Sequence, residues 1–463
     1  MRHQAYSEET INWEADYIVI GTGAGGAAAA TQLARGGAEV VMVEAGAWRD
    51  PADYPSSVYG SFRDLFDRWG ATVTRGPALW PVIQGSAVGG STVINSAIIV
   101  RTPGDIFEEW QRDYGVGGDA LAQRVWAHQD RLDEELFVEP TRVDRLGRSS
   151  QLALDAGKSM GIDSHIMRRA VKDCLGNSAC LQGCKAEKKQ STNLHMIPEV
   201  LNAGGGLLSC APVQKILMEG RKACGVTGRF RHPRTRKKGG CFTLRARRAV
   251  VVAASSTHTP CILQRSGIKS PALGEHFRSH PGCAIPGVYA DKVGMDFGAT
   301  QGWASSEFRK DPGYKLETLN LPLELAAVRL KGAGTALMER IEELPRMGVW
   351  LAACRAQSSG KVRNLFGRPS VHYVMDKADM TRLRSGLKKT AEMHFTMGAT
   401  HIIPGIQGMP YKLFADQLDL FDSASLHPRA YTCILSHLFG GAVMGADPRT
   451  SFCDGSGKAH GFE

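Results

Sequence analysis

The pattern of apolar residues is clearest at the start of the chain. Asp16–Ile20 is a short apolar run, Ala27–Arg35 is rich in small residues, and Glu39–Val43 is a second apolar run that ends beside Glu44. Short apolar runs are typical of buried strands, and the glycines between residues 21 and 26 indicate a tight turn. The pattern therefore predicts strand, glycine turn, helix and strand, which together form a βαβ unit with parallel strands.

Later segments add strands and helices to this unit. Arg248–Ala254 is apolar with almost no alternation, as expected of a strand covered on both faces in a parallel sheet. Helical patterns cover Ala120–Phe137 and Met380–Met397, whereas β-like and helical stretches alternate without clear boundaries between residues 287 and 373. Three short segments predict a small antiparallel layer: Val213–Met218, Gly225–Arg231 and Cys241–Arg245.

Composition narrows the class of protein. The 463 residues include 53 glycines, and 56 Lys and Arg against 46 Asp and Glu give a net charge of +10. An excess of positive charge is typical of proteins that bind nucleic acids, but aromatic residues make up only 7% of this chain. The densest basic run, Arg229–Lys238, lies between two strand-like segments. We interpret this run as an exposed hairpin loop and expect no nucleic-acid partner.

Neither a membrane span nor a disulfide scaffold is predicted. The longest uncharged stretch, Tyr17–Ala34, is centred on glycine and alanine and follows several acidic residues, which is not the pattern of a signal peptide. Eleven cysteines in so long a chain do not indicate a disulfide framework. We therefore expect a cytoplasmic protein without a membrane span.

The first glycine turn carries a dinucleotide-binding pattern. Gly21, Gly23 and Gly26 fit G-x-G-x-x-G between a strand and a helix, where glycines permit a tight turn and close approach of a pyrophosphate to the backbone. Glu44 ends the second strand, where a carboxylate can accept the ribose hydroxyls of an adenosine. An acid at this position disfavours NADP, but the pattern does not separate NAD from FAD.

A second glycine patch, residues 84–95 (QGSAVGGSTVIN), identifies a family resemblance. The chain resembles the glucose–methanol–choline (GMC) oxidoreductases, flavoenzymes that oxidise alcohols, and within them the branch of cholesterol oxidases, long-chain-alcohol oxidases and bacterial sugar dehydrogenases. The resemblance extends over five segments in the family's order. These are the Gly21 turn, residues 85–101, residues 249–260, His280-Pro-Gly282, and the stretch from His437 to the end.

The resemblance implies an α/β fold with two interleaved domains. A Rossmann-like FAD-binding domain, with a parallel sheet and the small antiparallel layer, would comprise residues 1–105, 196–285 and 430–463. An α+β substrate-binding domain, or cap, would comprise residues 106–195 and 286–429. The absence of any long linker or internal repeat in the sequence agrees with interleaved rather than serial domains.

The resemblance also implies which residues contact the cofactor. The backbone of Gly89, Gly90 and Ser91, together with Asn95, would lie against the flavin ring and diphosphate. Non-covalent FAD is expected, because no histidine precedes Asn95, where some family members attach the flavin. By similarity, two further residues would lie near the cofactor: Val213, beside the adenine, and Ala254, at the end of the buried strand. The next residue, Ser255, stands where the family generally has glycine.

Candidate catalytic residues come from the same resemblance. Residues 437–445 (HLFGGAVMG) are similar to the family stretch whose histidine faces the reactive flavin nitrogen, so His437 is the expected base. A neutral imidazole can take the hydroxyl proton as hydride leaves the carbon. Glu317 is a second candidate, as a carboxylate reaching the active site from the substrate domain, and its alternative is a structural residue at a strand edge. Similar proteins continue beyond the position of Glu463 into a strand with a second polar partner, so the resemblance predicts a truncated chain that lacks it.

Three cysteines, Cys174, Cys180 and Cys184, occur close together in a glycine-containing loop. Similar loops in some sugar dehydrogenases resemble a site for a three-iron, [3Fe-4S], cluster, because closely spaced thiolates can converge on one soft metal centre. Free or structural thiols are the alternative. A cluster would make the enzyme a dehydrogenase that passes electrons to a partner rather than an oxidase.

The leading hypothesis is thus an FAD-dependent oxidoreductase that acts on the CH–OH group of a small-molecule alcohol, sterol or sugar. The electron acceptor would be oxygen, a quinone or a carrier protein. Three alternatives remain open: a dehydrogenase with an iron–sulfur relay, a catalytically silent flavoprotein remnant, and an NAD-binding interaction module.

Overall fold

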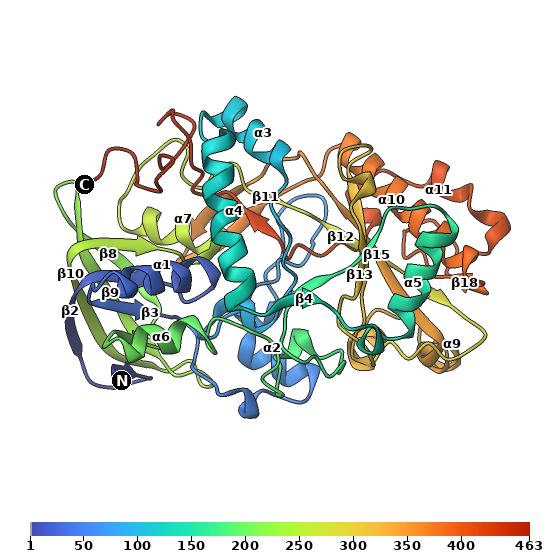
Figure 1. The fold of residues 1–463 in the computed structure, drawn as a ribbon, viewed down its shortest axis with the longest axis horizontal. Coiled ribbons are helices and arrows are strands. Elements are labelled where there is room, and N and C mark those ends of the chain that lie inside the picture. The colour runs from blue at the N-terminus through green and yellow to red at the C-terminus, as the bar shows by residue number, and fades with distance from the viewer. Residues whose placement is uncertain (1) are drawn as a thin grey trace.

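A seven-stranded sheet forms one half of the molecule. The structure is a computed structural model that describes residues 2–463. The strands of this sheet lie in the order β1-β7-β3-β2-β10-β9-β8 (Figure 1). The first five strands in this order pair in parallel, whereas β9 and β8 pair antiparallel to their neighbours. The strands are β1 (Arg2–Gln4), β2 (Ile11–Ile20), β3 (Val40–Val43), β7 (Gly206–Leu208), β8 (Val213–Glu219), β9 (Lys222–Arg231) and β10 (Lys238–Val252).

The parallel part of this sheet is covered on both faces because its side chains alternate. Val40 and Met42 of β3 face the cluster that contains helices α1 (Ala24–Arg35) and α6 (Met196–Asn202). Val41 and Val43 face the opposite cluster, which includes α7 (Ser255–Arg265) and the β8–β10 ribbon. The predicted α/β class with a parallel sheet is therefore confirmed.

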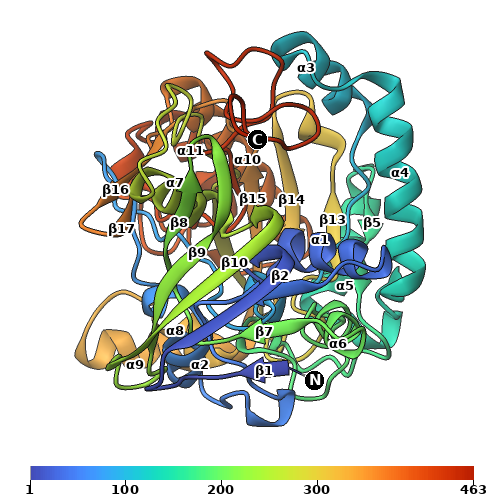
Figure 2. The same cartoon turned by 90° about the vertical axis from the view of Figure 1, so that its left-hand side faces the viewer.

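The small antiparallel layer is continuous with the parallel sheet. The two separately predicted strands, Cys241–Arg245 and Arg248–Ala254, are one long strand, β10, which passes a register shift between Ala246 and Ala249 (Figure 2). Arg247 at this shift makes ion pairs with Glu14, Asp16 and Glu39, so its charge lies outside the core. These contacts explain how a strand can continue through a cluster of arginines.

The other half of the molecule contains a six-stranded sheet in the order β18-β12-β15-β14-β13-β5, at the right of Figure 1. Its paired strands are antiparallel. They are β5 (His165–Ile166), β12 (Gly282–Val288), β13 (Trp303–Ser305), β14 (Tyr314–Thr318), β15 (Met347–Cys354) and β18 (His401–Ile402). Strand β12 spans the predicted domain boundary at residue 285, and the proposed division into domains stays a prediction.

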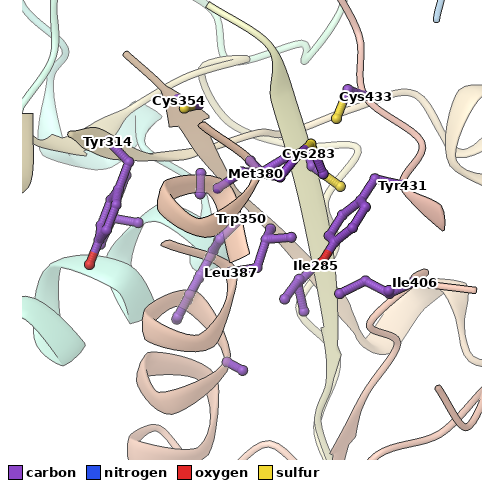
Figure 3. Packing of buried hydrophobic residues seen from close by; sticks show 14 of the residues in the cluster. Cys283, Ile285, Tyr314, Trp350, Cys354, Met380, Leu387, Ile406, Tyr431 and Cys433 are labelled. Carbon is purple, nitrogen blue, oxygen red and sulfur yellow. The ribbon is translucent and has the colours of Figure 1, made fainter. Parts of the chain in front are cut away.

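Helix α10 (Lys377–Thr396) packs on this second sheet, and the core of this half lies between them. Asp376 caps the helix by accepting a hydrogen bond from the Asp379 N–H at 2.8 Å. Met380 and Leu387 of α10 pack among buried side chains of β12 and β15, including Ile285 and Trp350 (Figure 3). The predicted helix at Met380–Met397 is confirmed and begins three residues earlier.

The remaining helices connect and cover these sheets. Helix α4 (Gly118–Glu135) confirms the helix predicted at 120–137. Within residues 2–463, no helix is apolar and long enough to cross a bilayer. The others are α2 (Val58–Leu65), α3 (Gly104–Tyr114), α5 (Arg148–Ser159), α8 (Leu323–Ala327), α9 (Gly334–Glu342) and α11 (Leu420–Ser423). Short two-stranded ladders join β4 (Val138–Pro140) to β6 (Arg168–Ala170), β11 (Arg278–Ser279) to β19 (Leu438–Phe439), and β16 (Lys361–Leu365) to β17 (Arg368–His372).

A buried histidine makes the stability of this core depend on pH. His394 stacks on Trp350 with ring centroids 3.8 Å apart, accepts a hydrogen bond from the Tyr289 hydroxyl and donates one to the Ile285 carbonyl. Burial lowers the pKa of His394 to about 3, so the folded protein keeps it neutral while the unfolded chain protonates it near its ordinary value of 6.5. Stability is fully present above pH 6.5 and is lost as the pH falls towards 3.

We expect the free energy of unfolding to fall by up to about 1.4 kcal/mol per pH unit within this window because of His394 alone. Urea unfolding at several pH values would measure this slope. In His394→Phe the slope between pH 6.5 and 4 should become shallower, whereas in the exposed control His128→Gln it should not. An identical slope in His394→Phe and the parent would contradict the assignment.

Candidate active site

The two glycine-rich segments touch each other at the carboxyl end of the parallel strands. Gly21 follows β2 with φ at +96°, and a Cβ on it would lie 2.5 Å from the Ala253 carbonyl oxygen. A Cβ on Gly90 would lie 2.7 Å from the Cα of Gly23. Both turns must therefore be bare backbone, and together they form a continuous cradle of main chain.

Helix α1 begins inside the predicted glycine turn. Gly23 is its N-cap, and the helix begins at Ala24, three residues earlier than predicted. Gly26 therefore already belongs to the helix. A Cβ on Gly26 would lie 2.0 Å from the Gly21 carbonyl oxygen, so glycine here lets the helix approach the end of β2. The free N–H groups of the first helical turn then point at the cavity and can bind an anion.

Glu44 and Thr22 join the two glycine turns. Glu44 is buried and accepts hydrogen bonds from the Thr22 N–H at 3.0 Å, the Thr22 hydroxyl at 2.8 Å and the Gly46 N–H at 2.8 Å. Burial raises the pKa of Glu44 and these hydrogen bonds oppose that effect. The Thr22 hydroxyl in turn accepts from the Gly89 N–H at 3.0 Å, which fixes the second turn to the first.

A cavity of about 1140 Å³ opens over this cradle. It is lined by eight of the residues singled out in the sequence: Gly21, Gly23, Glu44, Gly90, Ser91, Asn95, Val213 and Ala254. Gly26 and Gly89 are not at its surface, and shape its wall through the close contacts described above. A helix N-terminus, a bare main-chain cradle and a carboxylate in one cleft fit an adenine dinucleotide with a planar ring, as FAD has. The individual contacts predicted for these residues stay predictions.

A hairpin from the later part of the chain contributes to the cavity lining. The hairpin β16–β17 places Phe366, Gly367, Arg368 and Pro369 in the cavity lining, opposite the strand that carries Val213. Phe366 at its tip is 94% exposed. Nothing in the local sequence distinguishes this hairpin, so sequence analysis did not anticipate its contribution.

Ser255, which stands where the family generally has glycine, lies at a strained backbone position in the cavity wall. Its φ is +75°, and its hydroxyl lies 3.2 Å from the Thr257 hydroxyl and accepts from the His258 N–H at 3.3 Å. We expect Ser255→Gly to be more stable than Ser255→Ala by about 1 kcal/mol, because both lose the hydroxyl but only glycine relieves the strain. Thermal unfolding of the two variants would measure this difference, and equal stability would show that the backbone is not strained.

His437 lies at the edge of the cavity beside a second histidine. Its chain neighbours Ser436 and Leu438 line the cavity, and its own side chain is exposed to solvent. The ring centroids of His437 and His280 are 6.0 Å apart in an edge-to-face arrangement. The Ser279 hydroxyl donates to the His437 carbonyl oxygen at 2.7 Å, so the backbone of this segment is held in place by the ladder β11–β19.

Glu317 completes this cluster from the second sheet. It is buried in β14, which pairs with β13 on one side and β15 on the other, so the alternative of a strand-edge residue is wrong. It accepts a hydrogen bond from the Gln301 amide at 2.8 Å and forms an ion pair with Lys315. Burial on its own would raise the pKa of Glu317, but Lys315, His437 and Gln301 outweigh this effect and lower it.

The charges around the two histidines set their protonation states. Although part of the His437 ring faces solvent, the protein atoms around it desolvate the imidazolium, and this is the main cause that lowers the pKa of His437; Glu317 opposes the shift and Lys315 adds to it. Burial, and then the neighbouring His437, lowers the pKa of His280 to about 4. Both imidazoles are therefore neutral at neutral pH, and an imidazole in this state can accept a proton.

The cysteine loop lies directly behind the second glycine turn. Cys174, Cys180 and Cys184 border a separate cavity of about 200 Å³, together with the buried cations Arg169 and Lys189. Arg169 donates to the Cys180 sulfur at 3.0 Å and to the Cys174 sulfur at 3.6 Å. Burial alone would raise the pKa of Cys180, but Arg169 and Lys189 lower it.

These two cations also brace the cavity wall. Lys189 donates to the carbonyls of Val93, Asn95 and Cys180 at 2.5, 2.9 and 2.9 Å, and Arg169 donates to the Ser96 carbonyl at 2.9 Å. Across residues 2–463, no group of three His, Cys, Asp or Glu side chains is arranged to hold a metal ion. An iron–sulfur cluster at the three cysteines therefore stays a prediction.

Besides the β16–β17 hairpin, four residues that shape the site could not be assigned to it from the sequence. His280 was noted as part of a motif but not as a site residue, and its Pro-Gly continuation was the signal available. Thr22 occupies the unspecified position of the G-x-G pattern. No local signal marks the other two, Arg169 and Lys189, because their partners are backbone carbonyls and thiols elsewhere in the chain.

Comparison with known proteins agrees with this geometry. Residues 15–282 match the N-terminal domain of the GMC oxidoreductases, and residues 356–463 match the C-terminal domain. A GMC-type oxidoreductase of Mycobacterium tuberculosis is 31% identical over 97% of this chain and 70% of its own length. The long-chain-alcohol oxidase FAO1 of Arabidopsis thaliana is 25% identical over 97% of this chain and 62% of its own length.

Solved structures share the fold. A formate oxidase of Aspergillus oryzae superposes with a TM-score of 0.70 at 15% identity, covering 98% of this chain and 92% of that one. A pyridoxine 4-oxidase superposes with a TM-score of 0.67 at 15% identity, covering 97% and 92%. Since the family domains match most of the chain in order, and a relative above 30% identity extends over nearly all of it, the chain belongs to the GMC oxidoreductase family of FAD-dependent oxidoreductases.

Proposed function

We propose that this protein oxidises the CH–OH group of a small-molecule alcohol to a carbonyl with non-covalently bound FAD, and that His437 is the base. The observation that carries the proposal is the pair of His437 and His280, next to the cavity-lining residues Ser436 and Leu438, with buried Glu317 near enough for its charge to act on His437. The similarity to long-chain-alcohol oxidases supports an alcohol substrate.

Holding the cofactor would fall to the residues of the cradle. The first turn of α1 and the backbone of Gly21 and Gly23 would bind the diphosphate, and Glu44 the ribose. Gly90, Ser91 and Asn95 would lie along the ring, and Val213 beside the adenine. When bound, FAD accepts the hydride that leaves the alcohol carbon.

The protein's own residues would move the proton. Neutral His437 accepts the hydroxyl proton, and the nearby Glu317 carboxylate stabilises the imidazolium that results. Lys315 holds the Glu317 carboxylate ionised. Neutral His280 lies edge-to-face beside His437 without adding a positive charge.

We infer that the protein works in the cytoplasm. All eleven cysteines are free thiols, which agrees with a reducing compartment.

The experiment that tests the function is an anaerobic titration of the purified yellow protein. A short primary alcohol, a long-chain primary alcohol, a sterol and an aldose are added separately, and bleaching of the flavin absorbance is followed. We expect at least one alcohol to bleach it, and readmitted oxygen or a quinone dye then identifies the acceptor. A colourless protein that takes up no FAD would refute the proposal, as would bleaching by formate with none of the alcohols.

A further inference from the structure

Two buried cysteines face each other four residues or fewer from the histidines of the site. Gly282 and Ile434 form an antiparallel pair that exchanges both backbone hydrogen bonds, at 3.1 and 2.9 Å. The next pair along these segments is Cys283 opposite Cys433. Such a non-hydrogen-bonded pair has Cα atoms about 4.5 Å apart and directs both side chains to the same face.

The two thiols are in contact inside the core. Cys283 is 5% exposed and Cys433 is fully buried, and both belong to the cluster packed around Met380 and Trp350 (Figure 3). The two thiols lie close enough for each to shift the pKa of the other. The contact with Cys433 is the main cause that lowers the pKa of Cys283, whereas burial and then the contact with Cys283 raise the pKa of Cys433.

The geometry suits a disulfide. Bridged cysteines have Cα separations between about 4.4 and 6.8 Å, a range that includes the separation expected at this pair. Both thiols are free in the structure. The neighbour of Cys433 in the chain, Thr432, is exposed, so this segment has one face towards solvent while Cys433 points into the core.

We propose that Cys283 and Cys433 are a redox-active pair that a peroxide converts reversibly to a disulfide. The Cys283 thiolate attacks one oxygen of hydrogen peroxide, the O–O bond breaks, and Cys283 becomes a sulfenic acid while the departing hydroxide takes the proton of Cys433. The Cys433 thiolate then attacks the Cys283 sulfur, an S–S bond forms and the S–O bond breaks, and the hydroxide released takes up the proton that Cys283 gave to solvent when it ionised. Overall, two thiols are oxidised, one peroxide is reduced and two waters form.

The disulfide would join the two chain segments that carry the site's histidines. His280 precedes Cys283 in one segment, and His437 follows Cys433 in the other; farther along, the same segments pair again as β11 and β19. A covalent bond beside this ladder would fix the spacing of His280 and His437. An effect on turnover rests on the function proposed above, whereas formation of the bond does not.

The experiment maps cysteines in the full-length flavoprotein. The protein is treated with hydrogen peroxide, denatured with iodoacetamide present, and digested without reductant for mass spectrometry. We expect eleven alkylated cysteines before peroxide. After peroxide we expect a linked peptide pair containing Cys283 and Cys433 in place of their alkylated peptides, and after dithiothreitol we expect both alkylated peptides to return.

Three variants make the result specific. Cys283→Ser and Cys433→Ser should each lose the linked peptide, and Cys354→Ser should keep it. Cys354 is the matched control because it is buried in the same cluster and its thiol is directed to the Asp379 carbonyl at 3.5 Å. Eleven alkylated cysteines after peroxide, a link through Cys354, or sulfinic acid at Cys283 with Cys433 free would overturn the proposal. Failure of every alcohol to bleach the flavin would leave this mapping result unaffected, so the two proposals are tested separately.

Discussion

His437→Asn is expected to slow flavin reduction by an alcohol about 100-fold or more while leaving the yellow cofactor bound. The loss follows because a positioned general base typically contributes a factor of about 10² to 10⁴, and an amide cannot accept the proton. Stopped-flow absorbance under anaerobic conditions measures the reduction rate. The visible spectrum of the variant before mixing reports whether FAD remains.

The pH dependence provides an independent check of this role. Because the pKa of His437 lies below its ordinary value of 6.5, the base stays neutral to lower pH than a free imidazole. The reduction rate should therefore be flat through neutral pH and fall only on acidification below about 6.5. The exposed His427→Asn serves as the control and should keep the parent's rate and profile. Unchanged reduction in His437→Asn would exclude His437 as the base.

Gly26→Ala is expected to lower the affinity for FAD by at least about tenfold. The added Cβ would lie 2.0 Å from the Gly21 carbonyl oxygen, so α1 must move away from the end of β2. The helix N-terminus and the Gly21 turn then no longer converge on one diphosphate. Flavin fluorescence during titration of the apoprotein with FAD would give the dissociation constant.

The neighbouring glycine offers a matched control in the same helix. A Cβ on Gly25 meets no heavy atom within 4 Å, and the residue lines the cavity. Gly25→Ala should therefore fold like the parent and bind FAD within about threefold of its affinity, with alanine also favouring the helix. If both variants bound FAD equally well, close packing of α1 on β2 would not be what positions the cofactor.

The first βαβ unit could be predicted because every signal for it is local. Two apolar runs, a glycine turn and a small-residue helix lie within residues 16–43, and each agrees with its neighbours in period and length. In the structure β2 begins at Ile11, five residues before the predicted strand, and α1 begins at Ala24, because Gly23 can cap the helix while the glycines still form the turn.

Features that depend on distant partners could not be predicted. The arginines between residues 245 and 248 resemble the end of a strand, yet β10 continues because Arg247 pairs with three carboxylates, two on β2 and one just before β3. Glu317 has no local sign of burial, and its burial is compensated by Lys315 together with Gln301, which lies on another segment. Such compensation is visible only once the sheets are assembled.

The bracing of the second glycine turn from behind has a consequence for anyone who reshapes this enzyme. Lys189 and Arg169 donate hydrogen bonds to backbone carbonyls of residues 93–96. A segment that does not line the cavity therefore limits the mobility of the cavity wall. Shortening the stretch from Cys174 to Lys189 would therefore loosen residues 93–96. Under the proposed function, in which Asn95 lies along the flavin ring, the first effect would be loss of FAD during purification rather than a change in substrate preference.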